Sequence, residues 1–125
     1  MADHRRSLGA RGEALAAAHL AREGYRIVGR NVRAGGVELD LVASRGGLRV
    51  FVEVKTRSGR GLGLPEEAVD ARKRARLIRG ASAWLREHGS RVRRVRFDVI
   101  AVEWSADGSW TLRHLPSAFD AADSW

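Results

Sequence analysis

The sequence contains no cysteine, only two prolines and no long apolar run. The absence of cysteine excludes disulfide scaffolds, thiolate zinc sites and cysteine nucleophiles. No apolar stretch approaches the roughly 18 residues that a membrane-spanning helix needs. Residues 1–12 are charged and lack the apolar core of a signal peptide. We therefore expect a soluble cytoplasmic protein that has no membrane partner.

Histidine and lysine are scarce as well. The four histidines show no metal-ligand spacing, so the sequence predicts no zinc site. These histidines are His4, His19, His88 and His114. Only Lys55 and Lys73 are lysines, whereas 21 of the 23 basic residues are arginines. In a chain so biased toward arginine, a lysine is expected where a compact ammonium is needed and a planar guanidinium will not serve.

The rest of the composition is that of a basic globular domain. The 125 residues, 44% hydrophobic and 30% charged, fit one domain over residues 1–125. Its core is expected over about 7–104, with a C-terminal strand and tail over 105–125. The net charge of +8 and the pI near 11.4 favour a polyanionic partner, nucleic acid first, with anionic membranes and ribosomal RNA as alternatives. Ten of the basic residues, against one acid, fall in residues 72–96.

Hydrophobic periodicity predicts a mixed α/β domain in the order helix, three strands, helix, two strands. Gly24 is placed to end the first helix, while Pro65 and Gly89 mark the start and end of the second. The expected helices cover residues 7–23 and about 65–88. The expected strands cover residues 25–32, 37–43, 48–55, 92–104 and 110–115.

A glycine-rich loop over residues 58–64 precedes the second helix. It lacks the strand–loop–helix lysine-threonine context of a nucleotide-binding loop, so we predict no nucleotide or other small-molecule cofactor. We interpret the segment as a mobile loop beside the active face that can admit a DNA strand.

The second and third strands form a predicted hairpin that brings acids together. A turn at residues 45–46 or 44–47 pairs positions whose numbers sum to 91. Glu38 then lies opposite Glu53. Asp40 lies opposite Phe51 and is a diagonal neighbour of Glu53 on the same face. Lys55 projects from that face too, because it is two residues along the strand.

Glu38, Asp40 and Glu53 are three acids on one face of the hairpin, and they repel one another unless a cation lies there. Carboxylates suit Mg²⁺ or Mn²⁺, and such a cation binds phosphate oxygens and acidifies a water. Lys55 beside it can orient that water or neutralise charge on the phosphorus. Asp40, Glu53 and Lys55 thus indicate phosphodiester hydrolysis. The alternative is a solvated strand face on which Lys55 and Arg49 act as counter-charges.

Asp40, twelve intervening residues and then Glu53-Val54-Lys55 resemble the signature of the PD-(D/E)XK nuclease superfamily. A longer series of motifs, reaching to about Val102, resembles the YraN-like family of small bacterial proteins, which are related to archaeal Holliday-junction resolvases. Val37 departs from the pattern, since glycine is expected there. The motifs are Gly12-Glu13-Ala14, Gly24-Tyr25, Arg30-Asn31, Glu38-Leu39-Asp40-Leu41, Phe51-Val52-Glu53-Val54-Lys55-Thr56-Arg57, Pro65-Glu66-Glu67-Ala68-Val69, Lys73 and Arg96-Phe97-Asp98-Val99.

The resemblance implies a restriction-endonuclease-like core, a mixed central sheet flanked by helices. It implies that Asp40, Glu53 and the Val54 carbonyl bind Mg²⁺ or Mn²⁺. Lys55 would be the catalytic lysine. Glu13 would be an additional catalytic acid, although its position alone favours a solvated helix residue.

The remaining polar residues receive lesser roles. Glu38 is interpreted as a structural acid near the metal, and Asp98 as a buried partner of an arginine. The expected nucleic-acid contacts are Arg57, Arg72, Lys73, Arg76 and Arg79. For Arg57 the alternative is an ion pair with Glu66 or Glu67, and for Lys73 it is a solvated helix face.

These observations predict a metal-dependent endonuclease that acts on DNA, including branched or junction DNA. The alternative is a basic nucleic-acid-binding module that keeps the nuclease fold without catalysis. A third interpretation is a ribosome- or membrane-associated accessory protein recruited by charge. Trp84, Trp104 and Trp110 are expected in the core. For Trp125 three alternatives stay open: a free side chain, a packed one, or a contact in a homodimer.

Overall fold

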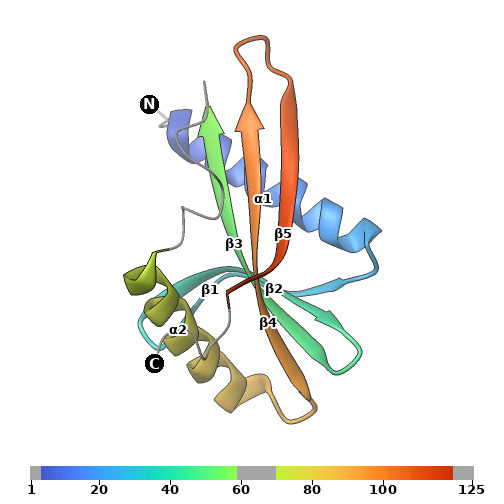
Figure 1. Cartoon of the computed structure of the whole chain (residues 1–125), viewed down its shortest axis with the longest axis vertical. Helices are drawn as coiled ribbons and strands as arrows, with labels where there is room; N and C mark the ends of the chain where they lie inside the picture. The colour runs from blue at the N-terminus through green and yellow to red at the C-terminus, as the bar shows by residue number, and fades with distance from the viewer. Residues whose placement is uncertain (1–3, 59–69, 120–125) are drawn as a thin grey trace.

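The computed structural model describes residues 4–58 and 70–119, with side chains from residue 7 onward. The observed order confirms the predicted mixed α/β class, with two helices and a five-stranded sheet (Figure 1). The elements are α1 (His4–Arg22), β1 (Arg26–Ala34), β2 (Val37–Arg45), β3 (Leu48–Ser58), α2 (Ala71–His88), β4 (Arg94–Trp104) and β5 (Trp110–Phe119). Neither helix, as far as the structure describes them, is long and apolar enough to cross a membrane.

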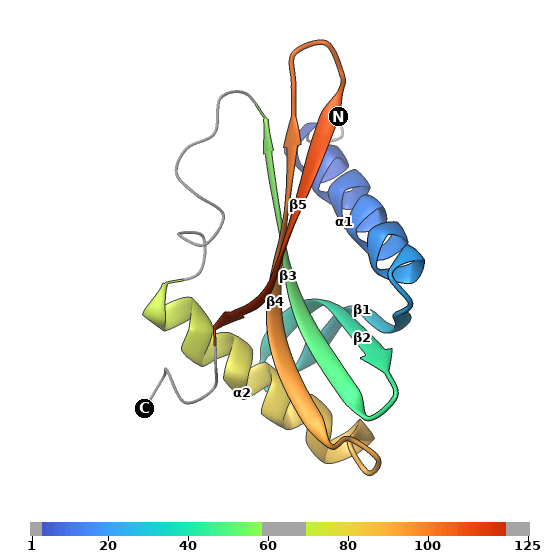
Figure 2. The same ribbon diagram turned by 45° about the vertical axis from the view of Figure 1, so that its right-hand side comes forward.

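The sheet has the strand order β1-β2-β3-β4-β5, and every neighbouring pair is antiparallel except β3 and β4. A parallel pair needs a crossover connection, which here includes α2. The two helices cover opposite faces of the sheet, as Figure 2 shows. The result is three layers, with α1 on one side and α2 on the other.

The α1 layer is packed through small and aliphatic side chains. Ala16 and Leu20 are fully buried against Val50 and Ile100 of the central strands. Gly12 lies so close to β3 that a β-carbon there would collide with the side chain of Thr56. The missing side chain at this position therefore lets the helix approach the sheet.

The α2 layer is fixed at both ends of the helix. Asp70 caps the start, because its carboxylate accepts a hydrogen bond from the Lys73 N–H at 2.9 Å. Gly89 ends the helix as predicted, donating its N–H to the Leu85 carbonyl. The predicted start at Pro65 lies outside the described residues. The apolar face of α2 packs on Phe51 and its neighbours, through Leu77, Gly80, Ala81 and Trp84.

The β2–β3 hairpin has a different register from the predicted one. Arg45 pairs with Leu48, so paired numbers sum to 93 and the turn is Gly46-Gly47. Gly46 has a φ of +57°, the conformation that glycine favours at the first position of a two-residue hairpin turn. The predicted turns, and the pairing of Glu38 with Glu53, are therefore wrong. The register moved by two residues, which preserves the parity of the pairing, and Asp40 and Glu53 still face the same cleft. Alternation breaks at Asp40, because Leu39 packs on the α2 side of the sheet and Leu41 on the α1 side.

The tryptophans were predicted correctly at two of three positions. Trp84 and Trp104 are buried, whereas Trp110 is 42% exposed. Trp110 opens the edge strand β5 and contacts the ring of Trp104, with centroids 6.5 Å apart. An edge strand has a neighbour on one side only, which leaves part of this indole in solvent. Trp125 lies outside the described residues.

Candidate active site

Asp40 and Glu53 lie where β2 and β3 separate. The strand pairing ends at Leu41 and Val52, one residue before each acid. Beyond that point the Val54 N–H donates to the Asp40 carboxylate instead, with 2.9 Å between N and Oδ2. This bond anchors Asp40 across the gap, next to Glu53. The acids are therefore closer in register than the diagonal neighbours that the sequence predicted.

Glu53 is nearly buried and is paired with a lysine from α2. Glu53 is only 9% exposed. The Lys73 ammonium lies 2.7 Å from Glu53 Oε1. Lys73 is in the first turn of α2, so the helix start is part of the site rather than a separate solvated face. Whether Lys73 also contacts nucleic acid stays a prediction.

A cleft of about 240 Å³ opens over these groups. Its walls come from β2, β3 and the first two turns of α2. They consist of Val37, Glu38, Asp40, Glu53, Lys73, Arg76 and Leu77. Two acids are thus at the bottom of a cleft whose helical wall is basic.

The electrostatics of the cleft show a shortage of positive charge. Burial, and next the negative charge of Glu53, raise the pKa of Asp40 to about 7, while the hydrogen bond from Val54 opposes the rise. The charge of Glu13 raises the pKa of Asp40 further, and that of Lys73 lowers it. A carboxyl whose pKa is raised beside a second acid is the arrangement that a bound cation relieves.

The predicted site residues are distributed unevenly around this cleft. Glu13, half-buried on α1, is near enough for its charge to act on Asp40. Lys55 is half-buried two residues beyond Glu53, on the same face of β3, but it does not line the cleft. Glu38 is exposed and lines the cleft rim. The roles of the Val54 carbonyl and of Lys55 stay predictions.

The basic residues predicted for nucleic acid lie on two elements. Arg57 is half-buried near the end of β3, and its proposed alternative partners, residues 66 and 67, lie outside the described ranges. The other three are exposed on α2, and we call them the α2 basic patch: Arg72, Arg76 and Arg79. Arg76 connects this patch to the cleft.

The donor set of the cleft suits a hard divalent cation. Among residues 7–58 and 70–119, no three histidine or acidic side chains are grouped as a ready-made metal site. Asp40 and Glu53 offer two carboxylates, which is the number that Mg²⁺ typically takes while it keeps several waters. The raised pKa of Asp40 is a second observation that fits a cation between the two acids.

Asp98 is in a different place, on the opposite face of the sheet. In register it pairs with Val52, whereas Glu53 pairs with Val99, and alternate residues face opposite sides. The prediction that it is a buried partner of an arginine is confirmed. Arg96 donates to both carboxylate oxygens, at 2.8 and 2.9 Å.

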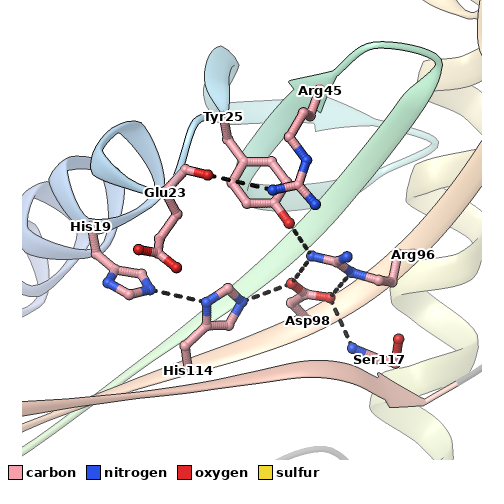
Figure 3. Close-up of polar contacts among 8 residues, drawn as sticks. All are labelled: His19, Glu23, Tyr25, Arg45, Arg96, Asp98, His114 and Ser117. Carbon is pink, nitrogen blue, oxygen red and sulfur yellow. Dashed lines mark hydrogen bonds and ion pairs between the residues drawn. The ribbon is translucent and has the colours of Figure 1, made fainter.

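The sequence did not reveal the other partners of Asp98, which Figure 3 shows. His114 Nε2 lies 2.8 Å from Asp98 Oδ2, and the Ser117 N–H donates to Oδ1. His19 of α1 contacts His114 in turn, with 3.0 Å between the ring nitrogens. Burial alone raises the pKa of Asp98, but these hydrogen bonds outweigh it and hold the pKa below 3.8. The network therefore joins α1, β4 and β5.

The fold and the cleft define a mixed α/β protein with two carboxylates at a strand gap and a basic helix beside them. The profile of the family described as "Uncharacterised protein family UPF0102" matches residues 12–102, which include both acids. The chain belongs to this family.

Full-length relatives support the assignment. A UPF0102 protein of Symbiobacterium thermophilum is 50% identical over 116 residues, which cover 93% of this chain and 98% of the relative. One of Nitratidesulfovibrio vulgaris is 45% identical over 124 residues, covering 99% and 92%. One of Geobacter sulfurreducens is 44% identical over 119 residues, covering 95% and 93%.

Proposed function

We propose that this protein is a metal-dependent endonuclease of the PD-(D/E)XK type, acting on DNA in the cytoplasm. The observation that carries the proposal is the cleft in which Asp40 and Glu53 meet at a strand gap, beside a basic helix. The order of elements and the spacing of Asp40, Glu53 and Lys55 support it through their resemblance to that superfamily. Branched or junction DNA is the proposed substrate, on the same resemblance.

Each residue has a role in this proposal. Asp40, Glu53 and the Val54 carbonyl would hold Mg²⁺ or Mn²⁺. A divalent cation bound there supplies Lewis acidity and lowers the pKa of a water. Lys55 stabilises the negative charge that develops on the phosphoryl oxygens. Glu13 is an additional acid of the site.

The α2 basic patch binds the phosphodiester backbone next to the cleft. Arginine and lysine neutralise phosphates and release counterions, so they hold nucleic acid without reading its sequence. The patch lies on α2, the helix that carries Lys73 and forms one wall of the cleft. In this proposal, a strand bound to the patch crosses the two acids.

The alternative function is a nucleic-acid-binding module without catalysis. Buried acids beside the phosphate-binding surface argue against it, because they repel the ligand and have no use in a pure binder. A residue-level test separates the two functions.

Metal binding is tested with Asp40→Asn against Glu38→Gln as the matched control. Mn²⁺ at millimolar concentration is expected to raise the melting temperature of the wild type by several degrees, since a ligand of the folded state stabilises it. Asp40→Asn abolishes the rise, and Glu38→Gln keeps it. An equal rise in Asp40→Asn would remove the metal site from this cleft.

Catalysis is tested with Lys55→Met, which keeps the stem of the side chain and deletes its ammonium. The variant is expected to fold, bind Mn²⁺ and bind DNA, yet cleave about 10²-fold more slowly, the scale of one lost electrostatic stabiliser. Lys55→Arg is expected to be slow too, because a planar guanidinium does not reproduce a compact charge. Wild-type cleavage rates in both variants would show that Lys55 has no catalytic role.

A further inference from the structure

The carboxylate of Glu53, a proposed metal ligand, is paired with the ammonium of Lys73. Lys73 Nζ is 2.7 Å from Glu53 Oε1. Only 9% of the Glu53 surface is exposed, so the ion pair with Lys73 compensates the charge of a carboxylate that has little access to water. The carboxylate of Glu53 is therefore paired with a cation of the protein itself.

The Lys73 ammonium and a divalent cation compete for the carboxylate of Glu53. Lys73 contacts Oε1 of Glu53, so a metal bound to this carboxylate would lie within a few ångströms of the ammonium. Like charges a few ångströms apart repel strongly in a partly buried cleft. A metal that binds Glu53 must therefore displace Lys73.

Displacement needs only a side-chain movement. The backbone of Lys73 is fixed, because its N–H is bound to Asp70 at the helix cap. Its side chain is 34% exposed and has four rotatable bonds, so it can turn away while α2 stays in place. The freed ammonium remains on the basic wall, one helical turn from Arg76, where a phosphodiester is proposed to arrive.

We propose that Lys73 is the counter-ion of Glu53 that competes with the metal for this carboxylate, and that it moves to a substrate phosphate once displaced. The inference rests on the proposed function and specifies how its site is loaded. A phosphate that accepts Lys73 makes the exchange easier, so metal and nucleic acid strengthen each other's binding. The protein then holds its metal tightly only when substrate is present.

The first test measures Mn²⁺ affinity by calorimetry at pH 8 without nucleic acid. Lys73→Met removes the competitor and is expected to bind Mn²⁺ about tenfold more tightly than wild type, the worth of one charge-assisted hydrogen bond. Lys73→Gln is expected to do the same and serves if the methionine variant folds poorly. Lys73→Arg keeps the cation and gives no gain.

Arg76→Met is the matched control. Arg76 is exposed on the same wall, and the described residues include no ion pair for it. The Arg76→Met substitution removes one positive charge from the same cleft but leaves the Lys73–Glu53 pair intact. The Mn²⁺ affinity of this variant is therefore expected to change less than about threefold. An equal gain in Arg76→Met and Lys73→Met would reduce the effect to general electrostatics and overturn the inference.

The second test measures the coupling to nucleic acid in the Lys55→Met background, where cleavage is expected to be about 10²-fold slower, and over times too short for the DNA to be cut. A DNA oligonucleotide is expected to tighten Mn²⁺ binding more when Lys73 is present than in the double variant with Lys73→Met. An equal effect contradicts the transfer to phosphate.

The outcomes separate this inference from the proposed function. If wild type binds Mn²⁺ and neither uncharged Lys73 variant binds it more tightly, the inference fails and the metal site stands. If no variant and no wild-type sample binds Mn²⁺, the proposed site and the inference both fail.

Discussion

Replacing Asp40 by asparagine is expected to stabilise the protein at alkaline pH. The pKa of Asp40 is about 7 in the fold against an ordinary 3.8. Each pH unit between these values is worth about 1.36 kcal/mol, so ionising this carboxyl costs the folded chain about 4 kcal/mol relative to the unfolded one. Asparagine has no charge to bury, but its oxygen accepts the Val54 hydrogen bond about 1 kcal/mol less strongly.

The sign follows from proton binding. Between pH 4 and 7 the folded state binds the Asp40 proton more tightly than the unfolded state, so its contribution to stability falls as the pH rises. Asp40→Asn and wild type should therefore be about equally stable at pH 4.5. At pH 8.5 the variant should be about 3 kcal/mol more stable, which corresponds to a melting temperature roughly 10 °C higher.

Urea denaturation at both pH values without added metal measures the difference. Glu38→Gln, a change at an exposed acid of the same cleft, is the control and should stay within about 0.5 kcal/mol of wild type. The reasoning is refuted if Asp40→Asn is no more stable than wild type at pH 8.5. It is also refuted if the gain is the same at both pH values.

Three further predictions concern the helices. Burial lowers the pKa of His19 below 6.5, and the charge of His114 lowers it further. The unfolded chain therefore binds this proton more tightly, and the free energy of unfolding decreases as the pH falls through 6.5. In melting experiments, His19→Gln should make the stability depend less on pH in this range. Gly12→Ala should destabilise the fold by about 1–3 kcal/mol in urea because α1 must move off β3, whereas Gly9→Ala, with open space around it, should stabilise it by about 0.5–1 kcal/mol. Removing the α2 basic patch should flatten the slope of log DNA affinity against log salt, and an unchanged slope would place the DNA elsewhere.

Much of the fold was predictable because alternation in the strands is strong. The faces of Asp40 and Glu53 followed from parity alone. The register did not, because the segment contains two adjacent glycines and either can begin the turn. The end of β5 was also missed, since Pro116 lacks an N–H and reads as a strand end, although an edge strand tolerates it.

The candidate site was predictable where it depended on neighbours in sequence. Asp40, Glu53 and Lys55 lie on one hairpin, so local pairing brought them together. The Lys73–Glu53 ion pair depends on where the crossover places α2 against the sheet. The His114 contact with Asp98 depends on the pairing of β4 with β5. Such contacts have no local pattern in the sequence.

The measurement that tests the central claim most directly is a cleavage screen with Mg²⁺ or Mn²⁺ over single-stranded, duplex, flap and four-way DNA, using wild type and Asp40→Asn. The account predicts that wild type cuts at least one substrate only when a divalent cation is present, and that Asp40→Asn cuts none. Intact DNA in every reaction, with DNA binding by the wild type preserved, would contradict the nuclease and leave the binding module.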